Sequence, residues 1–546
     1  MANHKKYIFI TGGVASSLGK GLAAASLGHL LEARGLRVEM LKMDPYINVD
    51  PGTMGPTQHG EVFVTDDGAE TDLDLGHYER FTSLTLSRKN NFTTGQVYLR
   101  VIENEREGKY LGKTVQVVPH ITDEIKRRIV LAAEDCDLLI GEIGGTVGDI
   151  ESRPFLESIR QLACDVGQEN VLLIHLVLLP FIESAGELKT KPAQHSVKEL
   201  QGTGLFPQII ICRTDREMDG ETIDKISMFC NVTRDNVFIS KNLTTIYKLP
   251  ISFHEQGLDD KVTELLGIWA TSPNIAPLEE VVRHFEHPKR EVRIGIVGKY
   301  TSLVESYKSL DEALSHGAVF HGARFCPVYI DAQDLEGGPA HRILESVDGV
   351  LVPGGFGERG IEGKIKAIEY VRKGRVPYLG ICLGMQLAMV EFARHVVGMT
   401  RASSEEFSSE GEPVIHYMKG QSSKGAKGGS MRLGAYPCRL KEKSRAREIY
   451  GTPEVSERHR HRLEVNNDYV PRMEEKGLVV SGRYEKLNLV EVVEIPDHPF
   501  FIGCQYHPEF KSKPVTPHPL FKHFVEKALE YGAAREKSGE RGDPHG

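Results

Sequence analysis

The chain has 546 residues, of which 40% are hydrophobic, and a formal net charge of −9. This length predicts two or three domains, and the negative charge argues against a protein that coats nucleic acid. No apolar run is long enough to span a bilayer, no signal peptide is evident, and eight scattered cysteines lack paired spacing, so we expect a cytoplasmic protein with reduced thiols.

The first predicted strand, residues 7–10, leads into a glycine-rich loop at residues 11–21 and then into a helix rich in Ala and Leu. Strand, loop, lysine and helix together predict a phosphate cradle, because backbone N–H groups face the anion and Lys20 adds a positive charge. The match to the common P-loop is imperfect. Five residues instead of four separate the second and third glycines, and Gly21 stands where Ser or Thr would hold magnesium. A purely structural turn is the alternative.

The missing hydroxyl predicts that carboxylates elsewhere in the chain hold the metal. Asp74 lies in the acidic run at residues 70–76, and Glu142 ends a predicted strand at residues 137–142. A carboxylate at the C-terminal end of a buried strand is well placed for a ligand in an open α/β sheet. Taken alone, Asp74 would more often be a solvated surface residue.

The first half of the chain alternates apolar strands with helical stretches, and residues 171–179 and 207–212 read as buried parallel strands. The pattern breaks in a proline-containing run at 271–277, and a new strand begins at 292. We therefore predict an α/β protein with a first domain over 1–269, a linker over 270–291 and a second α/β domain over 292–533.

Two further segments have a polar composition. Residues 403–430 are rich in Ser, Gly and Lys, which predicts a mobile surface loop. Residues 534–546 are charged with almost no apolar content, which predicts a disordered tail.

Cys382 is the most informative residue of the second half. It is flanked by Gly380 and Gly384, follows an apolar stretch and precedes an apolar helical run. Glycines at these positions permit a sharp strand-to-helix turn that exposes the thiol. His507 and Glu509 follow later in the chain and supply a base and a carboxylate to orient it. This set predicts a thiolate that attacks an acyl carbon, and a buried core thiol is the alternative.

Taken together, these motifs resemble those of the CTP synthase family over about residues 5–530. The motifs that carry the resemblance are GGVASSLGKG at 12–21, KMDPYINVDPGTMGPTQHGEVFV at 42–64, DGAETDLDLGHYERF at 67–81, EIGGTVGDIES at 142–152, KTKPAQHSVKEL at 189–200, VPGGFG, GICLGMQ, RHRHRLEVNN and CQYHPEF. The resemblance implies a P-loop-type parallel-sheet amidoligase domain followed by a class I glutamine amidotransferase domain.

The resemblance also implies a reaction and its ligands. ATP would phosphorylate the 4-oxygen of UTP, and ammonia from glutamine would pass between the domains and displace the phosphate to give CTP. The family uses Mg²⁺, is activated by GTP, is inhibited by CTP and acts as a homotetramer. It implies neither a nucleic-acid partner nor a membrane.

In the second half, the resemblance assigns a catalytic triad to Cys382, His507 and Glu509. It places oxyanion-hole donors at Gly355 and at the backbone N–H of Leu383. The other positions that it assigns to glutamine binding are Gly384, Met385, Gln386, Glu406 and Arg462.

In the first half, the resemblance assigns magnesium to Asp74 and Glu142. The positions assigned to ATP are Ser17, Leu18, Gly19, Lys20, Gly21, Leu22 and Asp74. The positions assigned to UTP or CTP are Ser16, Asp149, Ile150, Glu151, Lys189, Thr190, Lys191, Pro192, Ala193, Gln194 and Lys225, with residues 149–151 in the feedback pocket. The three lysines would neutralise the triphosphate, and without the resemblance they read equally well as surface lysines.

Three more positions match family sites of narrower function. Residues 241–243 match an adenine contact, His59 matches a gate for ammonia, and Arg432 matches a position tied to GTP activation. For His59, a structural histidine is the competing interpretation.

Two other functions are compatible with parts of the sequence. Another ATP-dependent glutamine amidotransferase, such as a corrinoid amidase, should lack the DPYINVDPGTM and GDIES motifs that this chain contains. A partitioning-type ATPase scaffold with an inactive glutaminase would not need the intact Cys, His and Glu set.

Overall fold

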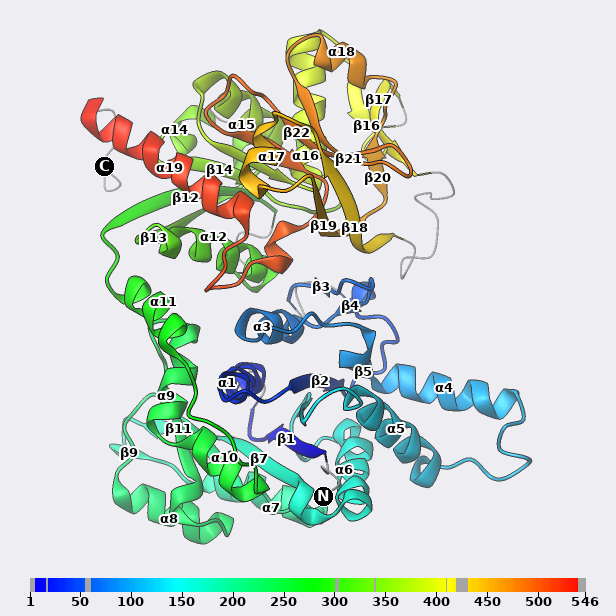
Figure 1. Cartoon of the computed structure of the whole chain (residues 1–546), viewed down its shortest axis with the longest axis vertical. Coiled ribbons are helices and arrows are strands. Elements are labelled where there is room, and N and C mark those ends of the chain that lie inside the picture. The colour runs from blue at the N-terminus through cyan, green and yellow to red at the C-terminus, as the bar shows by residue number, and fades with distance from the viewer. Residues whose placement is uncertain are drawn as a thin grey trace. The chain divides into compact units, whose positions relative to one another are not determined.

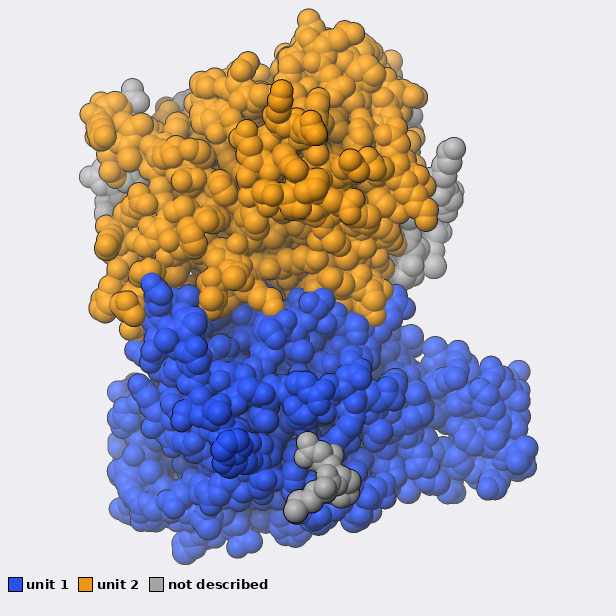
Figure 2. All heavy atoms as spheres, viewed as in Figure 1, with its two compact units in different colours: residues 1–51, 74–282 blue, residues 52–73, 283–546 orange. Residues whose placement is uncertain are grey.

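The computed structural model describes residues 5–15, 18–54, 60–299, 304–337, 340–408, 410–418 and 431–538. The chain forms two compact units (Figures 1 and 2). Unit 1 comprises Met1–Pro51 and Asp74–Val282, and unit 2 comprises Gly52–Leu73 and Arg283–Gly546. The predicted continuous domain over 1–269 differs from this division, because the segment Gly52–Leu73 packs with the second unit.

Unit 1 is built on a seven-stranded sheet in which every neighbouring pair is parallel. In spatial order its strands are β11 (Val237–Ser240), β10 (Ile209–Arg213), β7 (Val171–Leu178), β1 (Lys6–Gly12), β6 (Leu138–Ile143), β2 (Val38–Asp44) and β5 (Asn91–Thr93). Strands β1, β6, β7 and β10 were all predicted from their apolar runs. Such runs are continuous because both faces of a parallel sheet are covered.

The helices of unit 1 cover the two faces of this sheet (Figure 1). Met40 of β2 lies against α1, whereas its neighbour Leu41 belongs to the core formed with α5 and α6. This alternation follows from the two-residue period of a strand. The helices are α1 (Lys20–Ala33), α3 (Asp74–Phe81), α4 (Thr94–Arg106), α5 (Thr122–Ala132), α6 (Arg153–Val166), α7 (Lys191–Gly202), α8 (Gly220–Cys230), α9 (Leu249–Glu255) and α10 (Leu258–Leu266); α11 (Ala276–Glu286) runs from unit 1 into unit 2, and a hairpin pairs β8 (Phe181–Ile182) with β9 (Glu187–Leu188).

Unit 2 contains a nine-stranded mixed sheet, parallel from β13 to β23 and antiparallel from β23 to β19. In spatial order its strands are β13 (Ala323–Asp331), β12 (Arg290–Gly298), β14 (Gly349–Val352), β15 (Tyr378–Ile381), β23 (Phe501–Cys504), β22 (Leu489–Glu494), β21 (Val479–Tyr484), β18 (Arg432–Leu440) and β19 (Glu454–His461). A smaller sheet joins β16 (Ala402–Ser404), β17 (Glu412–Tyr417) and β20 (Leu463–Val465).

Two hydrophobic cores lie on the two faces of the parallel part of this sheet. Leu351 of β14 packs in the core that contains residues of α12 and α19, whereas Val350 and Val352 pack with α15 and α16. The helices of unit 2 are α12 (Lys308–Phe320), α13 (Asp334–Gly337), α14 (Ala340–Leu344), α15 (Ile361–Gly374), α16 (Leu383–Phe392), α17 (Arg445–Tyr450), α18 (Val470–Glu474) and α19 (Pro519–Ser538).

Two predictions about irregular segments need correction. The predicted surface loop at 403–430 contains the end of β16 and all of β17, and residues 409 and 419–430 lie outside the described residues. The predicted disordered tail begins inside α19, which continues to Ser538, and residues 539–546 are not described. Buried apolar residues anchor α19 along its first three turns, so the helix extends into its charged end.

The segment Gly52–Leu73 is attached to unit 2 by specific contacts. Its hairpin of β3 (Phe63–Val64) and β4 (Glu70–Thr71) encloses Asp66, whose carboxylate accepts from Arg458 Nε at 2.5 Å. Arg460 Nε donates to Glu70 Oε1 at 2.7 Å. The rings of Phe63 and Phe510 meet edge to face, with centroids 5.2 Å apart.

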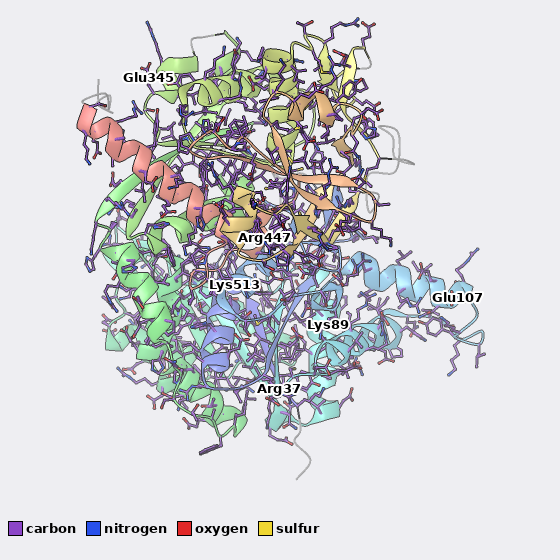
Figure 3. The ribbon with its side chains drawn as sticks, turned by 45° about the horizontal axis from the view of Figure 1, so that its top comes forward. Arg37, Lys89, Glu107, Glu345, Arg447 and Lys513 are labelled. Carbon is purple, nitrogen blue, oxygen red and sulfur yellow. The ribbon has the colours of Figure 1, made fainter. Side chains whose placement is uncertain are left out.

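Arg37, labelled in Figure 3, is an exposed side chain that pairs with Asp137 at 2.6 Å. An exposed pair of this kind contributes about 0–1 kcal/mol. Within the described ranges, no helix combines the length and the apolar character that a membrane crossing requires.

Candidate active site

Cys382 stands in the predicted strand-to-helix turn, between β15 and α16. Its φ of 52° and ψ of −102° are unusual for a residue with a side chain, and such strain is commonly held at functional sites. A Cβ on Gly384 would lie 2.1 Å from the Val352 carbonyl oxygen, so only glycine allows the helix to begin this close to β14.

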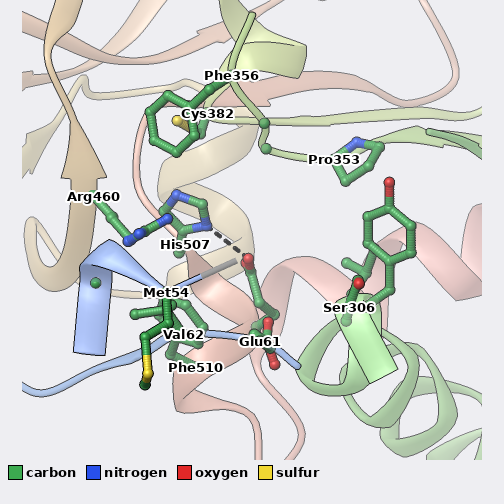
Figure 4. A pocket seen from close by; sticks show the side chains of 16 residues that line it. Met54, Glu61, Val62, Ser306, Pro353, Phe356, Cys382, Arg460, His507 and Phe510 are labelled. Carbon is green, nitrogen blue, oxygen red and sulfur yellow. Dashed lines mark hydrogen bonds and ion pairs between the residues drawn. The ribbon is translucent and has the colours of Figure 1, made fainter. Parts of the chain in front are cut away.

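His507 faces Cys382 and is oriented by Glu509 (Figure 4). The His507 Nδ1 and Glu509 Oε1 atoms are 2.7 Å apart. On the other side of the ring, a Cβ on Gly354 would lie 3.6 Å from both His507 Nε2 and Cys382 Cβ. Burial disfavours the imidazolium, but the Glu509 carboxylate and the Cys382 sulfur outweigh burial and raise the pKa of His507 to about 10. At neutral pH His507 is therefore expected to be an imidazolium beside the Cys382 sulfur, the arrangement that activates a cysteine nucleophile.

Replacing Glu509 with glutamine removes the carboxylate that raises the pKa of His507, so that pKa should fall. If the triad has the glutaminase role that the family resemblance implies, the wild-type protein should lose glutamine hydrolysis at alkaline pH only near pH 10. In Glu509→Gln this loss should move to lower pH, and the rate at pH 9 should fall about 100-fold. Profiles of kcat/KM for glutaminase between pH 6 and 10.5 test this.

The exposed carboxylate of Glu454 on β19 offers a matched control. Glu454→Gln should keep the wild-type profile. An alkaline limb that stays near pH 10 in Glu509→Gln would show that Glu509 does not hold the proton on His507.

Gln505 is a site residue that the sequence-based assignments missed. Its Nε2 lies 3.6 Å from Cys382 Sγ, and its Oε1 accepts from Gln386 Nε2 at 3.1 Å. Gln386 also donates to the Leu463 carbonyl at 3.1 Å. Gln386, which the resemblance assigns to glutamine binding, is thus a buried bridge that positions Gln505. The available signal was the position of Gln505 two residues before His507 in CQYHPEF.

The glycine loop after β14 is held by two charged side chains. Lys299 Nζ donates to the Phe356 carbonyl at 2.8 Å, and Glu406 Oε1 accepts from the Gly357 N–H at 2.7 Å. Burial raises the pKa of Glu406, while Arg462 lies close enough to oppose that shift. The structure thus brings Glu406 and Arg462 to the loop that contains Gly355.

A cavity of about 290 Å³ opens beside the triad. Cys382 and His507 line one part, and Met54, Glu61 and Val62 of the segment Gly52–Leu73 line another (Figure 4). This cavity lies wholly within unit 2.

The phosphate loop of unit 1 ends at Gly19, which has a left-handed backbone conformation with a φ of 87°. Helix α1 begins at the next residue, Lys20. Lys20 Nζ donates to the Gly145 carbonyl at 2.8 Å, and burial lowers the pKa of this lysine. The Val147 N–H donates to the Gly12 carbonyl at 2.8 Å, which ties the loop after β6 to the phosphate loop. Three assigned residues, Ser16, Ser17 and His59, lie outside the described residues.

Asp74 and Glu142 converge on one cation, the ammonium of Lys42. Lys42 Nζ lies 2.9 Å from Glu142 Oε1 and contacts Asp74 Oδ2. Burial alone would raise the pKa of the Asp74 carboxyl. The nearby positive charges, that of Lys42 foremost, together outweigh burial and hold this pKa below its usual range. A Cβ on Gly21 would lie 2.1 Å from Asp74 Oδ1, so this carboxylate fills the space next to the missing P-loop hydroxyl.

This donor set suits magnesium. The described residues hold no cluster of three or more His, Cys, Asp or Glu side chains that could bind a metal. Magnesium usually takes one or two protein carboxylates together with substrate phosphates and waters, and two carboxylates that share a cation beside a phosphate loop fit this pattern.

Comparisons with known proteins cover both units. The family profile described as "CTP synthase N-terminus" matches residues 6–268, and "Glutamine amidotransferase class-I" matches residues 302–527. The CTP synthase of Geobacter metallireducens is 59% identical over 535 residues, which cover 98% of this chain and 99% of that protein. The chain belongs to the CTP synthase family.

The chain is also similar to other members of the CTP synthase family. The CTP synthase of Desulfotalea psychrophila is 55% identical over 536 residues, or 96% of this chain and 97% of that protein. A solved glutaminase domain of Trypanosoma brucei CTPS with bound acivicin is 37% identical, covering 44% of this chain and 94% of that domain with a TM-score of 0.41. The predicted family, α/β fold class and enzyme class are confirmed.

The lysines that family resemblance assigns to UTP lie near the start of α7 and on α8. Lys189 contacts Glu187, and the charge of Lys225 also acts on this carboxylate, so the structure brings these two lysines together. Lys191 is the first residue of α7, and its ammonium lies 5.7 Å from the Phe229 ring centroid. A helix N-terminus flanked by lysines suits a polyphosphate.

The structure also shows the surroundings of Asp149, Lys241 and Arg432, three other positions that the resemblance to the CTP synthase family assigns. Asp149 lies in the loop after β6 and accepts from the Thr146 N–H at 3.2 Å. Lys241 pairs with Glu217. Arg432 is buried, with its guanidinium 3.2 Å from Glu464 and 2.7 Å from Glu491. The structure therefore gives Arg432 internal partners in place of a surface that could receive GTP.

Proposed function

We propose that this protein converts UTP to CTP, using ATP and ammonia released from glutamine. The observation that carries the proposal is the presence in one chain of an oriented Cys, His and Glu set and a separate carboxylate and lysine site beside a phosphate loop. The 59% sequence identity to a known CTP synthase over 98% of this chain supports the proposal.

In unit 2, the Cys382 thiolate attacks the glutamine amide carbon and a tetrahedral oxyanion forms. The N–H groups at Gly355 and Leu383 face the developing negative charge. Imidazolium His507 gives its proton to the leaving nitrogen, so ammonia departs and a thioester remains. Water, deprotonated by His507, then hydrolyses the thioester to glutamate, which restores the Cys382 thiolate and the His507 imidazolium.

In unit 1, the 4-oxygen of UTP takes the γ-phosphoryl group of ATP, leaving ADP. The oxygen becomes a leaving group, and ammonia displaces it as phosphate to give CTP. Lys20 and the N-terminus of α1 bind the ATP phosphates, while Asp74 and Glu142 would hold magnesium. When bound, the metal neutralises phosphate charge in the transition state.

The ammonia is proposed to travel through the protein, because free ammonia is largely protonated at neutral pH. The cavity beside Cys382 supports this route, since Met54, Glu61 and Val62 line it. These residues belong to a segment that leads at Asp74 directly into the proposed metal site.

The absorbance change on conversion of UTP to CTP tests the function. CTP should form with ATP, magnesium and either glutamine or ammonium chloride. Glutamate release without CTP formation would refute the synthetase and favour a different amidotransferase.

We further propose that the protein is cytoplasmic, assembles into a homotetramer, is activated by GTP and is inhibited by CTP. Lys189, Lys191 and Lys225 would bind the UTP triphosphate where subunits meet, so a polyanion would relieve repulsion between lysines. Sedimentation velocity should show a shift from dimer to tetramer on addition of ATP and UTP. A mass distribution that ignores nucleotide would contradict this assembly.

Feedback inhibition is expected to depend on Glu151, which we assign to a CTP base pocket distinct from the UTP pocket. Glu151→Gln should weaken CTP inhibition about 10-fold, because a charged hydrogen bond contributes about 1.5–3 kcal/mol. The KM for UTP should change much less. Inhibition constants measured at several UTP concentrations test this, with Glu157→Gln on α6 as the control. Equal effects on both nucleotides would point to one common base site.

A further inference from the structure

Lys42 is a buried lysine of β2 that lies between the two carboxylates proposed to hold magnesium. Strands β2 and β6 are parallel neighbours with Lys42 in register with Glu142, so both side chains leave the same face of the sheet. Asp74 reaches the same ammonium from the first residue of α3. Two strands and one helix therefore bring three charged groups to one point.

The charges of this cluster show why a lysine is present. Asp44, Asp74 and Glu142 are three carboxylates, and Lys42 Nζ also lies 4.0 Å from Asp44 Oδ1. Lys20 and His77 also lie near Asp74, but Lys20 directs its ammonium to the Gly145 carbonyl. Buried carboxylates without a cation are costly, and Lys42 is the cation in direct contact with both Asp74 and Glu142, whose charge it partly offsets.

The same oxygen atoms cannot serve both a metal ion and the Lys42 ammonium. Lys42 contacts Asp74 Oδ2 and Glu142 Oε1, and two cations this close in a buried site repel each other strongly, so a metal ion that takes these oxygens would displace Lys42. Lys42 then needs another anionic partner. Nucleotide phosphates held by the adjacent loop would supply one, because Gly21, in the first turn of α1 just after that loop, lies close to Asp74.

We propose that Lys42 is a built-in counter-ion of the metal site, which occupies the Asp74 and Glu142 carboxylates in the nucleotide-free enzyme and makes metal binding depend on a polyphosphate. This inference rests on the proposed assignment of Asp74 and Glu142 to magnesium. It adds that the enzyme takes up metal together with nucleotide, and that Lys42 offsets part of the carboxylate charge between turnovers.

Binding of Mn²⁺ to the full-length protein without nucleotide tests the proposal, with free Mn²⁺ followed by electron paramagnetic resonance. Wild-type protein should bind Mn²⁺ weakly at this site, and Lys42→Met, which removes the charge at similar volume, should bind it at least 10-fold more tightly. Lys42→Arg keeps the charge and should remain weak. Lys89→Met, which removes a lysine paired with Glu39 at 3.0 Å in the same unit, should match wild type.

A second readout is thermal stability, in which Mn²⁺ should raise the Tm of Lys42→Met more than that of wild type. If Lys42→Met does not fold, Lys42→Gln retains a donor for the carboxylates without the charge and replaces it. Unchanged Mn²⁺ affinity in the uncharged variant would overturn the counter-ion role.

A double variant separates this failure from failure of the metal assignment. Lys42→Met combined with Asp74→Asn should lose the tight Mn²⁺ site. Tight binding that persists in the double variant would place the metal elsewhere and remove the basis of the inference, while CTP formation would still test the proposed reaction independently.

Discussion

Cys382→Ala is expected to abolish CTP formation from glutamine and to leave CTP formation from ammonium chloride near the wild-type rate. The thiol is the only nucleophile in the proposed glutaminase route, and loss of a catalytic nucleophile costs several orders of magnitude in rate, here at least about 1,000-fold. The proposed synthetase residues lie in unit 1, whereas Cys382 lies in unit 2. Initial rates of CTP formation with each nitrogen source measure both effects.

Cys326→Ala serves as the control, because Cys326 is a partly exposed free thiol on β13 of the same unit. It should keep both activities. Loss of both activities in folded Cys382→Ala would contradict the division of the two chemistries between units.

Asp74→Ala is expected to abolish CTP formation with either nitrogen source. The side chain is one of two carboxylates proposed for magnesium, and a metal contributes several kcal/mol of charge stabilisation in phosphoryl transfer, so the loss should reach about 1,000-fold. Glutamine hydrolysis measured without nucleotides should continue. CTP formation across a magnesium titration and glutamate release give the two readouts.

Asp123→Ala provides a matched control, because Asp123 is an exposed carboxylate of α5 in the same unit that pairs with Lys126 at 3.2 Å. This variant should behave as wild type. Normal synthesis by Asp74→Ala at saturating magnesium would exclude the metal assignment.

Short-range features were predictable from the sequence because their physical causes are local. The strand-to-helix turn at Cys382 needs glycines on both sides, and GICLG displays them directly. Gly21 predicted that a carboxylate replaces the P-loop hydroxyl, and Asp74 lies against that position. The apolar runs of β1, β6, β7 and β10 likewise identified the buried parallel sheet.

Features that depend on distant parts of the chain were not predictable in this way. The pairs Arg458–Asp66 and Arg460–Glu70 join residues about 390 positions apart, and they are what attach the segment Gly52–Leu73 to unit 2. Lys42 reads as one charged residue in a strand until the register with Glu142 is known. Gln505 gains a role only through its contact with Cys382.

Helix α19 illustrates a different reason for failure. Composition alone made residues 534–546 look disordered, yet the described residues remain helical to Ser538. The buried apolar residues earlier in α19 stabilise the helix, and helix formation is cooperative, so the charged end follows.

Transfer of the glutamine amide nitrogen into CTP tests the central claim most directly. The enzyme would be supplied with UTP, ATP, magnesium and glutamine labelled with ¹⁵N at the amide, in a buffer that contains unlabelled ammonium. Mass spectrometry should find ¹⁵N in the amino group of CTP at nearly the enrichment of the glutamine, because the ammonia passes internally from Cys382. CTP with the enrichment of the bulk ammonium, or glutamate release without CTP, would contradict the account.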